Sequence, residues 1–173
     1  KPQSPYAECK LKEEEVVSRL IRQGSQSFIC RLGTIYGTSS GMRFHTAVNK
    51  FCFQAALGLP ITVWRTALHQ HRPYLGLDDC CRAMRHMLTS QPNTLEAGLY
   101  NVLSGNHTVN DIVDTIREFV PGLDVQFVDS AIMNQLSYKV SAEKLKKTGF
   151  EFTSQLKVNI ESTISLLSGV SYV

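Results

Sequence analysis

The sequence of 173 residues lacks the features of a membrane-spanning or secreted protein. No apolar run approaches the roughly 20 residues that a membrane-spanning helix needs, and the first ten residues have no apolar core of a signal peptide. The five cysteines are odd in number and form no CxxC pair, which favours free thiols in a reducing compartment. We therefore expect a cytoplasmic protein that has no membrane partner.

Several common catalytic signatures are also missing. No serine stands in a Gly-x-Ser-x-Gly turn, which argues against a serine hydrolase, and there is no Walker-type phosphate loop. His69 and His71 are only two residues apart, with no cysteine or carboxylate nearby, so we predict no metal site.

The acidic residues have one long gap. None occurs between Glu15 and Asp78, although this stretch contains seven lysines and arginines: Arg19, Arg22, Arg31, Arg43, Lys50, Arg65 and Arg72. Such a stretch either faces an anion, for which a phosphorylated ligand is the sharper hypothesis, or is compensated by carboxylates from elsewhere in the fold. The cations are spread out and not interleaved with stacking aromatics, so nucleic acid is not the expected partner.

Apolar residues make up 43% of the chain and charged residues 19%, which is enough apolar material for a sizeable core. Their periodicity predicts strands at residues 27–35, 61–64, 73–77, 99–103 and 125–128. It predicts helices at residues 7–23, 46–57, 78–87 (capped by Asp78 and Asp79), 106–120 (capped by Thr108), 142–148 and 156–167. Strands that alternate with helices in this way indicate an α/β fold.

Tyr6 and Lys10 are a candidate pair for proton transfer. A spacing of four places the phenol and the ammonium group on one face of a helix, one turn apart. A neighbouring cation favours the ionised phenol, which can take a proton from a sugar or alcohol hydroxyl. The spacing alone is equally compatible with chance.

The segment RLGTIYG, residues 31–37, reads as a strand that ends in a glycine-flanked loop. Open α/β sheets bind ligands at the carboxyl ends of their strands, and Gly33 and Gly37 allow a ligand to approach the backbone closely. An ordinary strand and turn is the alternative. Arg72, beside another short strand, could fork onto phosphate oxygens.

The segment GMRFHTAVNKF, residues 41–51, brings Arg43, His45 and Asn49 to the start of a predicted helix. A helix N-terminus with a nearby cation is a natural phosphate site. Asn49 follows His45 by about one turn, so both could reach one ligand, while a histidine without a functional role remains the alternative.

The order of the segments resembles the C-terminal half of extended short-chain dehydrogenases/reductases, and within them the NAD-dependent epimerase/dehydratase branch that acts on nucleotide sugars. The segments that carry the resemblance are SPYAECK, RLGTIYG, GMRFHTAVNKF, GLPITVW, HQHRPYLGLDDCCRAM, LYNVLSGNHTVNDIV and SYKVSAEKLKKTGFEF. Each is weak alone, but together they extend from about Ser4 to Leu167.

The resemblance implies a Rossmann-type NAD-binding fold with a small, mostly helical substrate domain. Tyr6 would be the catalytic acid/base, Lys10 its partner that also holds the nicotinamide ribose, and Ile35 a backbone contact of the nicotinamide. NAD is the implied cofactor, with NADP left open, and a nucleotide diphosphate sugar the implied ligand. The implied substrate-binding residues are Thr34, Arg43, His45, Asn49, Trp64 and Arg72.

The sequence departs from this family in three places. The GxxGxxG dinucleotide loop and the catalytic Ser or Thr precede these segments in the family and are not among the 173 residues, so we expect a fragment that is inactive alone. Thr34 stands where many members have a sugar-contacting Asn, and the Gly-Asp-Gly turn is missing between Trp64 and Arg72. We expect residues 1–37 to be the trailing part of the Rossmann-type domain. Residues 38–173 would be mainly substrate domain, with segments near 73–104 returning to the sheet.

The function expected from these features is NAD-dependent epimerisation or dehydration of a nucleotide sugar through a transient keto-sugar. The alternative is a non-catalytic relative of the same fold that senses a dinucleotide or sugar nucleotide, against which the Tyr6/Lys10 pair argues. A homodimer through the helix that bears this pair is possible, and burial within the domain explains its apolar residues equally well.

Overall fold

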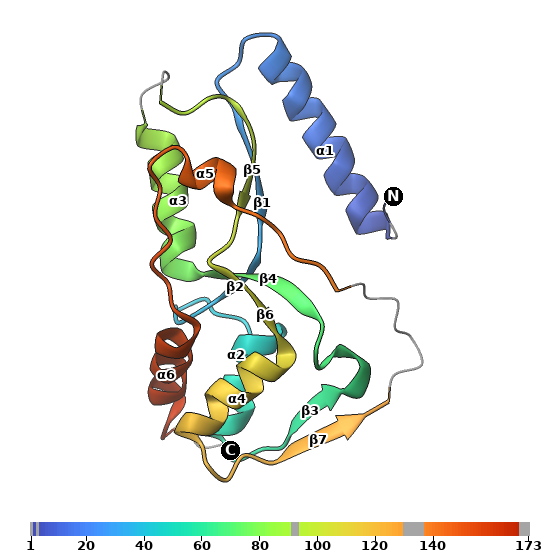
Figure 1. Ribbon diagram of the computed structural model, residues 1–173, viewed down its shortest axis with the longest axis vertical. Helices are drawn as coiled ribbons and strands as arrows, with labels where there is room; N and C mark the ends of the chain where they lie inside the picture. The colour runs from blue at the N-terminus through green and yellow to red at the C-terminus, as the bar shows by residue number, and fades with distance from the viewer. Residues whose placement is uncertain (1, 3, 91–93, 130–136, 170–173) are drawn as a thin grey trace.

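The computed structural model describes residues 2, 4–90, 94–129 and 137–169. One half of the molecule is a layered α/β unit (Figure 1). Its strands β1 (Phe28–Leu32) and β5 (Gly98–Val102) pair in parallel, with Phe28 opposite Gly98 and Leu32 opposite Val102. Figure 1 shows these strands between α1 (Pro5–Arg22) on one side and, on the other, α3 (Leu77–Thr89) with α5 (Glu143–Lys146).

A three-stranded sheet lies in the middle of the molecule (Figure 1). Its central strand β4 (His71–Gly76) pairs in parallel with β2 (Thr34–Tyr36) and antiparallel with β6 (Gly105–Thr108). The chain passes directly from β1 to β2 and from β5 to β6, so this sheet continues the layered unit toward the other half.

The other half is mostly helical. Helices α2 (Ala47–Ala56), α4 (Val109–Phe119) and α6 (Leu156–Leu167) pack against one another. Beside them β3 (Ile61–Trp64) pairs in parallel with β7 (Val125–Val128), and a 3-10 turn, η1 (Arg65–Ala67), follows β3.

Each half has its own apolar core. In the layered unit, Leu75, Leu95, Tyr100, Val102 and Leu145 are among the buried residues. In the helical half, the core collects residues of α2, α4, α6 and β3, together with Tyr36 and Tyr74 of the middle sheet: Val48, Phe51, Cys52, Ala55, Ile61, Val63, Ile112, Val113, Ile116, Ile160 and Ile164.

The single strand predicted at residues 27–35 is wrong, because the structure divides it at Gly33. A Cβ atom at this position would lie 3.1 Å from backbone atoms of Pro73 and Tyr74. The Gly33 N–H donates to the Val102 carbonyl at 2.9 Å. Glycine therefore lets the chain pass close to β4 and move from one sheet to the next. The close approach expected at Gly33 was that of a ligand, and the structure shows the β4 backbone there instead.

Two predicted helix starts are also corrected. Asp78 and Asp79 do not cap α3, because the helix begins earlier, at Leu77, and its N-cap residue Gly76 makes no side-chain cap. The helix predicted from residue 106 begins at Val109, because residues 105–108 pair with β4 instead. The predicted Thr108 cap is confirmed: its hydroxyl accepts from the Asp111 N–H at 3.0 Å, and the Asp111 carboxylate accepts from the Thr108 N–H at 2.7 Å.

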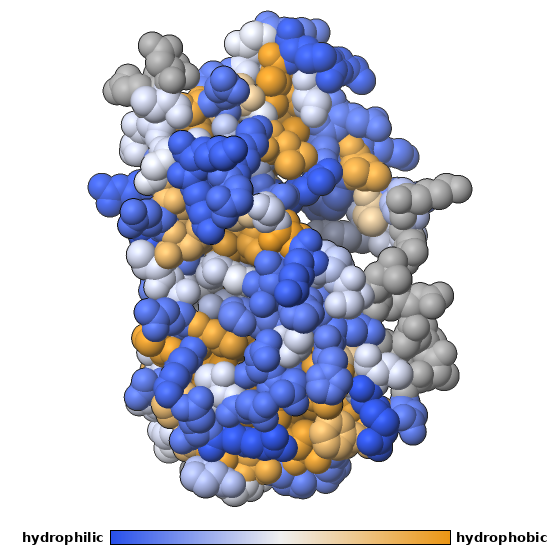
Figure 2. All heavy atoms as spheres, viewed as in Figure 1, coloured by the Kyte–Doolittle hydropathy of each residue, from blue (hydrophilic) through white to orange (hydrophobic). Residues whose placement is uncertain are grey.

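Helix α1 has no buried residue. Its apolar side chains remain accessible, with Val16 54% exposed and Leu20 45% exposed, and Figure 2 shows hydrophobic patches on and beside this helix in a largely hydrophilic surface. A polar contact ties the helix to the sheet: the Arg31 guanidinium donates to both oxygens of Glu14, at 2.8 and 2.6 Å. This hydrogen-bonded partner lowers the pKa of Glu14.

The predicted free thiols are confirmed for all five cysteines. Within the described ranges, no helix is long and apolar enough to cross a membrane. Those ranges also contain no group of three or more His, Cys, Asp or Glu side chains arranged to hold a metal ion.

Candidate functional site

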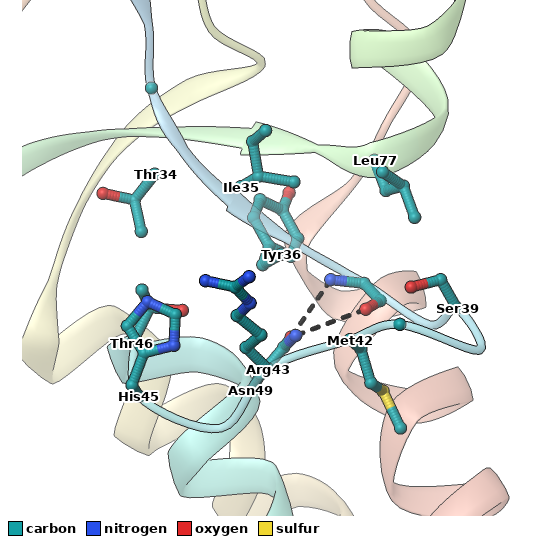
Figure 3. Close-up of a pocket in the computed structure, with 13 residues that line it drawn as sticks. Thr34, Ile35, Tyr36, Ser39, Met42, Arg43, His45, Thr46, Asn49 and Leu77 are labelled. Carbon is teal, nitrogen blue, oxygen red and sulfur yellow. Dashed lines mark hydrogen bonds between the residues drawn. The ribbon is translucent and has the colours of Figure 1, made fainter.

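A first cavity of about 460 Å³ opens where β2 ends. It is built by β2, by the loop that leads to α2, and by the first turn of α2 (Figure 3). Four of the predicted site residues and one backbone contact meet here: Thr34, Arg43, His45, Asn49 and Ile35. The remaining lining residues include Gly33, Tyr36, Gly37, Ser39, Met42, Thr46 and Leu77.

Asn49 fixes the shape of this cavity. Its side chain is buried, at 4% exposure, and its Oδ1 accepts from the Gly37 N–H at 3.0 Å while its Nδ2 donates to the Gly37 carbonyl at 3.3 Å (Figure 3). Gly37 has a φ of +121°, in the region that favours glycine. The amide thus holds the left-handed turn after β2 against α2, and its position on the cavity wall is compatible with a ligand contact as well.

We expect Asn49→Ala to lower the free energy of unfolding by about 1–3 kcal/mol, because the buried backbone groups of Gly37 lose their partner. Asn110→Ala is the matched control, since the only side-chain partner of Asn110 among the described residues is the exposed Asp114 carboxylate, and it should cost less than about 0.5 kcal/mol. Urea denaturation of the two variants measures both values. Equal losses would contradict a structural role for the Asn49 amide.

Figure 3 shows the Arg43 side chain rising among the lining residues, with its guanidinium between His45 and Asn49. No Asp or Glu lines the cavity. Among the residues that the structure describes, the Arg43 side chain makes no ion pair and no hydrogen bond. The guanidinium is therefore available to an anionic ligand.

A second cavity of about 280 Å³ adjoins the first, and His45 lines both. It brings together Trp64 and Arg72, two predicted site residues, with Lys50, Gln70 and Tyr74. The Arg72 guanidinium is held in place by the Gln70 amide oxygen at 3.4 Å and by the Tyr138 ring, whose centroid is 4.9 Å away. The lining of this cavity contains no carboxylate either.

The two cavities explain how the charge of the acid-free stretch is distributed. Arg31 and Arg65 take carboxylates from elsewhere, from Glu14 and Asp129. Lys50, like Arg43, makes no side-chain ion pair with any described residue. Compensation by distant carboxylates is therefore confirmed for Arg31 and Arg65. That the stretch faces an anion stays a prediction, for which Arg43 and Lys50 at the cavities are the candidates.

Tyr6 and Lys10 line neither cavity. They lie one turn apart on α1, where Lys10 Nζ is 5.7 Å from the centre of the Tyr6 ring. Lys10 also donates to Glu13 at 2.7 Å, and this hydrogen bond raises the pKa of the ammonium group. The Tyr6 side chain is accessible, since the residue is 72% exposed.

Tyr36, unlike Tyr6, lines the first cavity, and its phenol is in a different environment. The residue is 1% exposed, and its Oη is buried without a hydrogen-bond partner among the described residues. Burial, with a smaller contribution from the Asp79 charge, raises the pKa of Tyr36 to about 12. Tyr36 is therefore neutral near pH 7 and is not suited to act as a base.

Sequence reasoning did not single out Lys50, Gln70 or Ser39 as site residues. Lys50 could have been predicted from the sequence, because it is one of the seven cations in the acid-free stretch and directly follows Asn49. Gln70 and Ser39 reach the cavities through the η1 segment and the loop after β2. No local pattern marks either residue.

Comparison with known families decides the relationship. The model of the NAD dependent epimerase/dehydratase family matches residues 1–102, more than half of the chain. The chain belongs to this family. The predicted resemblance is thereby confirmed.

Relatives of the epimerase/dehydratase chain show the same fold. The UDP-glucose 4-epimerase of Thermus thermophilus, solved as a complex with NAD, is 24% identical with a TM-score of 0.79 over 98% of this chain and 55% of its own. A GalE-like L-threonine dehydrogenase from Cupriavidus necator is 18% identical with a TM-score of 0.77, over 96% of this chain and 56% of its own. The predicted α/β, Rossmann-type fold class is confirmed.

A sequence relative is the UDP-sulfoquinovose synthase of Sulfolobus acidocaldarius. It is 30% identical over 73 residues, which are 42% of this chain and 18% of the relative. The chain therefore spans little more than half the length of the solved relatives and a smaller share of this one. The solved relatives include enzymes named for a nucleotide sugar and for an amino acid, so the fold alone does not choose the substrate.

Proposed function

We propose that the whole protein oxidises a hydroxyl of a nucleotide diphosphate sugar with NAD, as the first step of an epimerisation or a dehydration. The observation that carries this proposal is the pair of adjoining cavities, whose linings contain cations and no carboxylate. The second cavity offers an aromatic surface, Trp64, beside Lys50 and Arg72, which suits a base and a pyrophosphate. The first offers hydroxyl and amide groups for a sugar.

The residues present fit one end of the dinucleotide. Tyr6 and Lys10 are both accessible on one face of α1, and Ile35 is 38% exposed at the first cavity, as contacts of a nicotinamide ribose and ring need to be. The 173 residues contain no glycine-rich loop for the pyrophosphate of NAD, and we propose that residues outside them supply it. When bound, NAD supplies a hydride acceptor and donor.

Side chains of the described residues would carry out the proton transfer and bind the diphosphate. The Tyr6 phenolate, which the Lys10 ammonium group favours, takes the proton of the sugar hydroxyl, while the hydride on the carbon that bears this hydroxyl would pass to bound NAD. The resulting keto-sugar is either reduced on its other face or loses water. Arg72 and Lys50 hold the diphosphate, so that the sugar stays oriented during the reaction.

The domain organisation proposed with this function follows the two cores in outline, although Tyr36 packs in the core of the helical half and Leu145 in that of the layered unit. Residues 1–37 form the trailing part of the dinucleotide-binding domain and residues 38–173 mainly the substrate domain. Segments near 73–104 return to the sheet, and the pairing of β5 with β1 supports this return.

Isothermal titration of the whole protein with UDP-glucose and UDP, as representative ligands, tests the proposal. We expect Arg72→Gln to weaken both about tenfold or more, because one charge-assisted contact to the diphosphate is lost. Arg117→Gln, a matched change at an arginine on α4 that pairs with Asp114, should leave both affinities unchanged. Equal affinities for wild type and Arg72→Gln would contradict the placement of the diphosphate.

A further inference from the structure

The first cavity contains a positive charge, that of Arg43, which a neutral sugar would leave without a counter-ion. Lys50 and Arg72 line only the second cavity, whereas Arg43 lines only the first. The diphosphate proposed for the second cavity therefore has its own two cations there. Arg43 is left beside the position of the sugar.

No carboxylate of the described residues lies against the Arg43 guanidinium. None of the lining residues of either cavity is an Asp or a Glu, and no carboxylate of the described ranges pairs with this side chain. Figure 3 shows the guanidinium directed among the lining residues and not away from them. The hydroxyl groups of Thr34, Ser39 and Thr46 line the same space and can donate hydrogen bonds.

A guanidinium in a cavity that is lined by hydroxyl groups and by no acid matches a planar carboxylate, which accepts two parallel hydrogen bonds from an arginine. We propose that the sugar unit carries a carboxylate, so that the substrate is a nucleotide-linked uronate, bound with its carboxylate on Arg43. This inference rests on the nucleotide-sugar function proposed above and narrows it to one substrate class.

Titration calorimetry of the whole protein with UDP, UDP-glucose and UDP-glucuronate tests the inference, because the last two ligands differ in the group on C5 of the sugar. Wild type should bind UDP-glucuronate at least about tenfold more tightly than UDP-glucose. Arg43→Gln should remove this preference, so that UDP-glucuronate binds no more tightly than UDP-glucose, and should leave the affinity for UDP, which has no sugar beyond the diphosphate, unchanged. Lys50→Gln should weaken all three ligands by a similar factor.

Arg85→Gln is the charge-matched control, since this exposed arginine on α3 lines neither of the two cavities, and it should change no affinity. A wild type that binds UDP-glucuronate no more tightly than UDP-glucose overturns the uronate inference and leaves the nucleotide-sugar function standing. Loss of UDP affinity in Arg43→Gln overturns it too, because Arg43 would then hold the diphosphate. If wild type binds none of the three ligands, the proposed function itself fails.

Discussion

Replacing Tyr6 by Phe in the whole protein should lower kcat about 10²-fold or more. The substitution removes only the phenolic oxygen, which in the proposed reaction accepts the proton of the sugar hydroxyl. The phenol is exposed and contributes no hydrogen bond to the described part of the chain, so the free energy of unfolding should not change. Steady-state kinetics with a nucleotide sugar and NAD, beside thermal unfolding, measures both quantities.

Two lysines on the same helix give a matched comparison, with Lys10 as the test and Lys12 as the control. Lys10→Gln should also lower kcat, because the ammonium group one turn from Tyr6 is lost. Lys12→Gln, an equivalent change at an exposed neighbour, should leave activity as in wild type. Near-normal turnover by Tyr6→Phe would contradict the assignment of Tyr6 as the acid/base.

Asp79→Ala should destabilise the protein by about 3–5 kcal/mol, because it leaves several partly buried donors without the acceptor that they share. The Asp79 carboxylate is fully buried, at 0% exposure. It accepts from the backbone N–H groups of Thr153 at 2.9 Å and Ser154 at 3.0 Å, from the Ser104 hydroxyl at 2.7 Å and from Arg82 at 2.9 Å. These bonds fasten the start of α3 to the segment that leads into α6.

The neighbouring residue provides the control. Asp78 is exposed in the same turn, and Asp78→Ala should cost no more than about 0.5 kcal/mol. Chemical denaturation of both variants near pH 7 gives the comparison. Similar losses for the two variants would mean that the buried hydrogen bonds of Asp79 contribute little.

The same carboxylate predicts a pH dependence. Burial raises the pKa of Asp79, but the hydrogen bonds from Thr153, Ser104 and Ser154 outweigh this effect and lower the pKa below its usual value. A lowered folded-state pKa means that the contribution to stability is full above the unfolded pKa of about 3.9 and is lost as the pH falls through the folded-state pKa. The difference in stability between wild type and Asp79→Ala should therefore shrink below about pH 4. A difference that stays constant down to about pH 2 would contradict the lowered pKa.

Patterns within one element were sufficient for much of the fold. The period of apolar residues predicted β3, β7 and α6 with the bounds that the structure has, and Thr108 was correctly predicted as the cap of α4. Errors arose where a distant segment decides the local conformation. The division of the strand at Gly33 depends on the approach of β4, and the strand conformation of residues 105–108 depends on pairing with it.

By itself the sequence determined the α/β class, the order of most of its elements and the family, because periodicity, caps and short motifs are local properties of the chain. It also singled out seven cations, most of which the structure pairs with carboxylates or places at the cavities, since the acid-free stretch is visible without coordinates. Only the tertiary structure decided which cations find carboxylates and which meet at the two cavities. It also decided that Asp79 is a buried acceptor and not a helix cap. These outcomes depend on segments that lie far apart in the chain, and only folding brings them together.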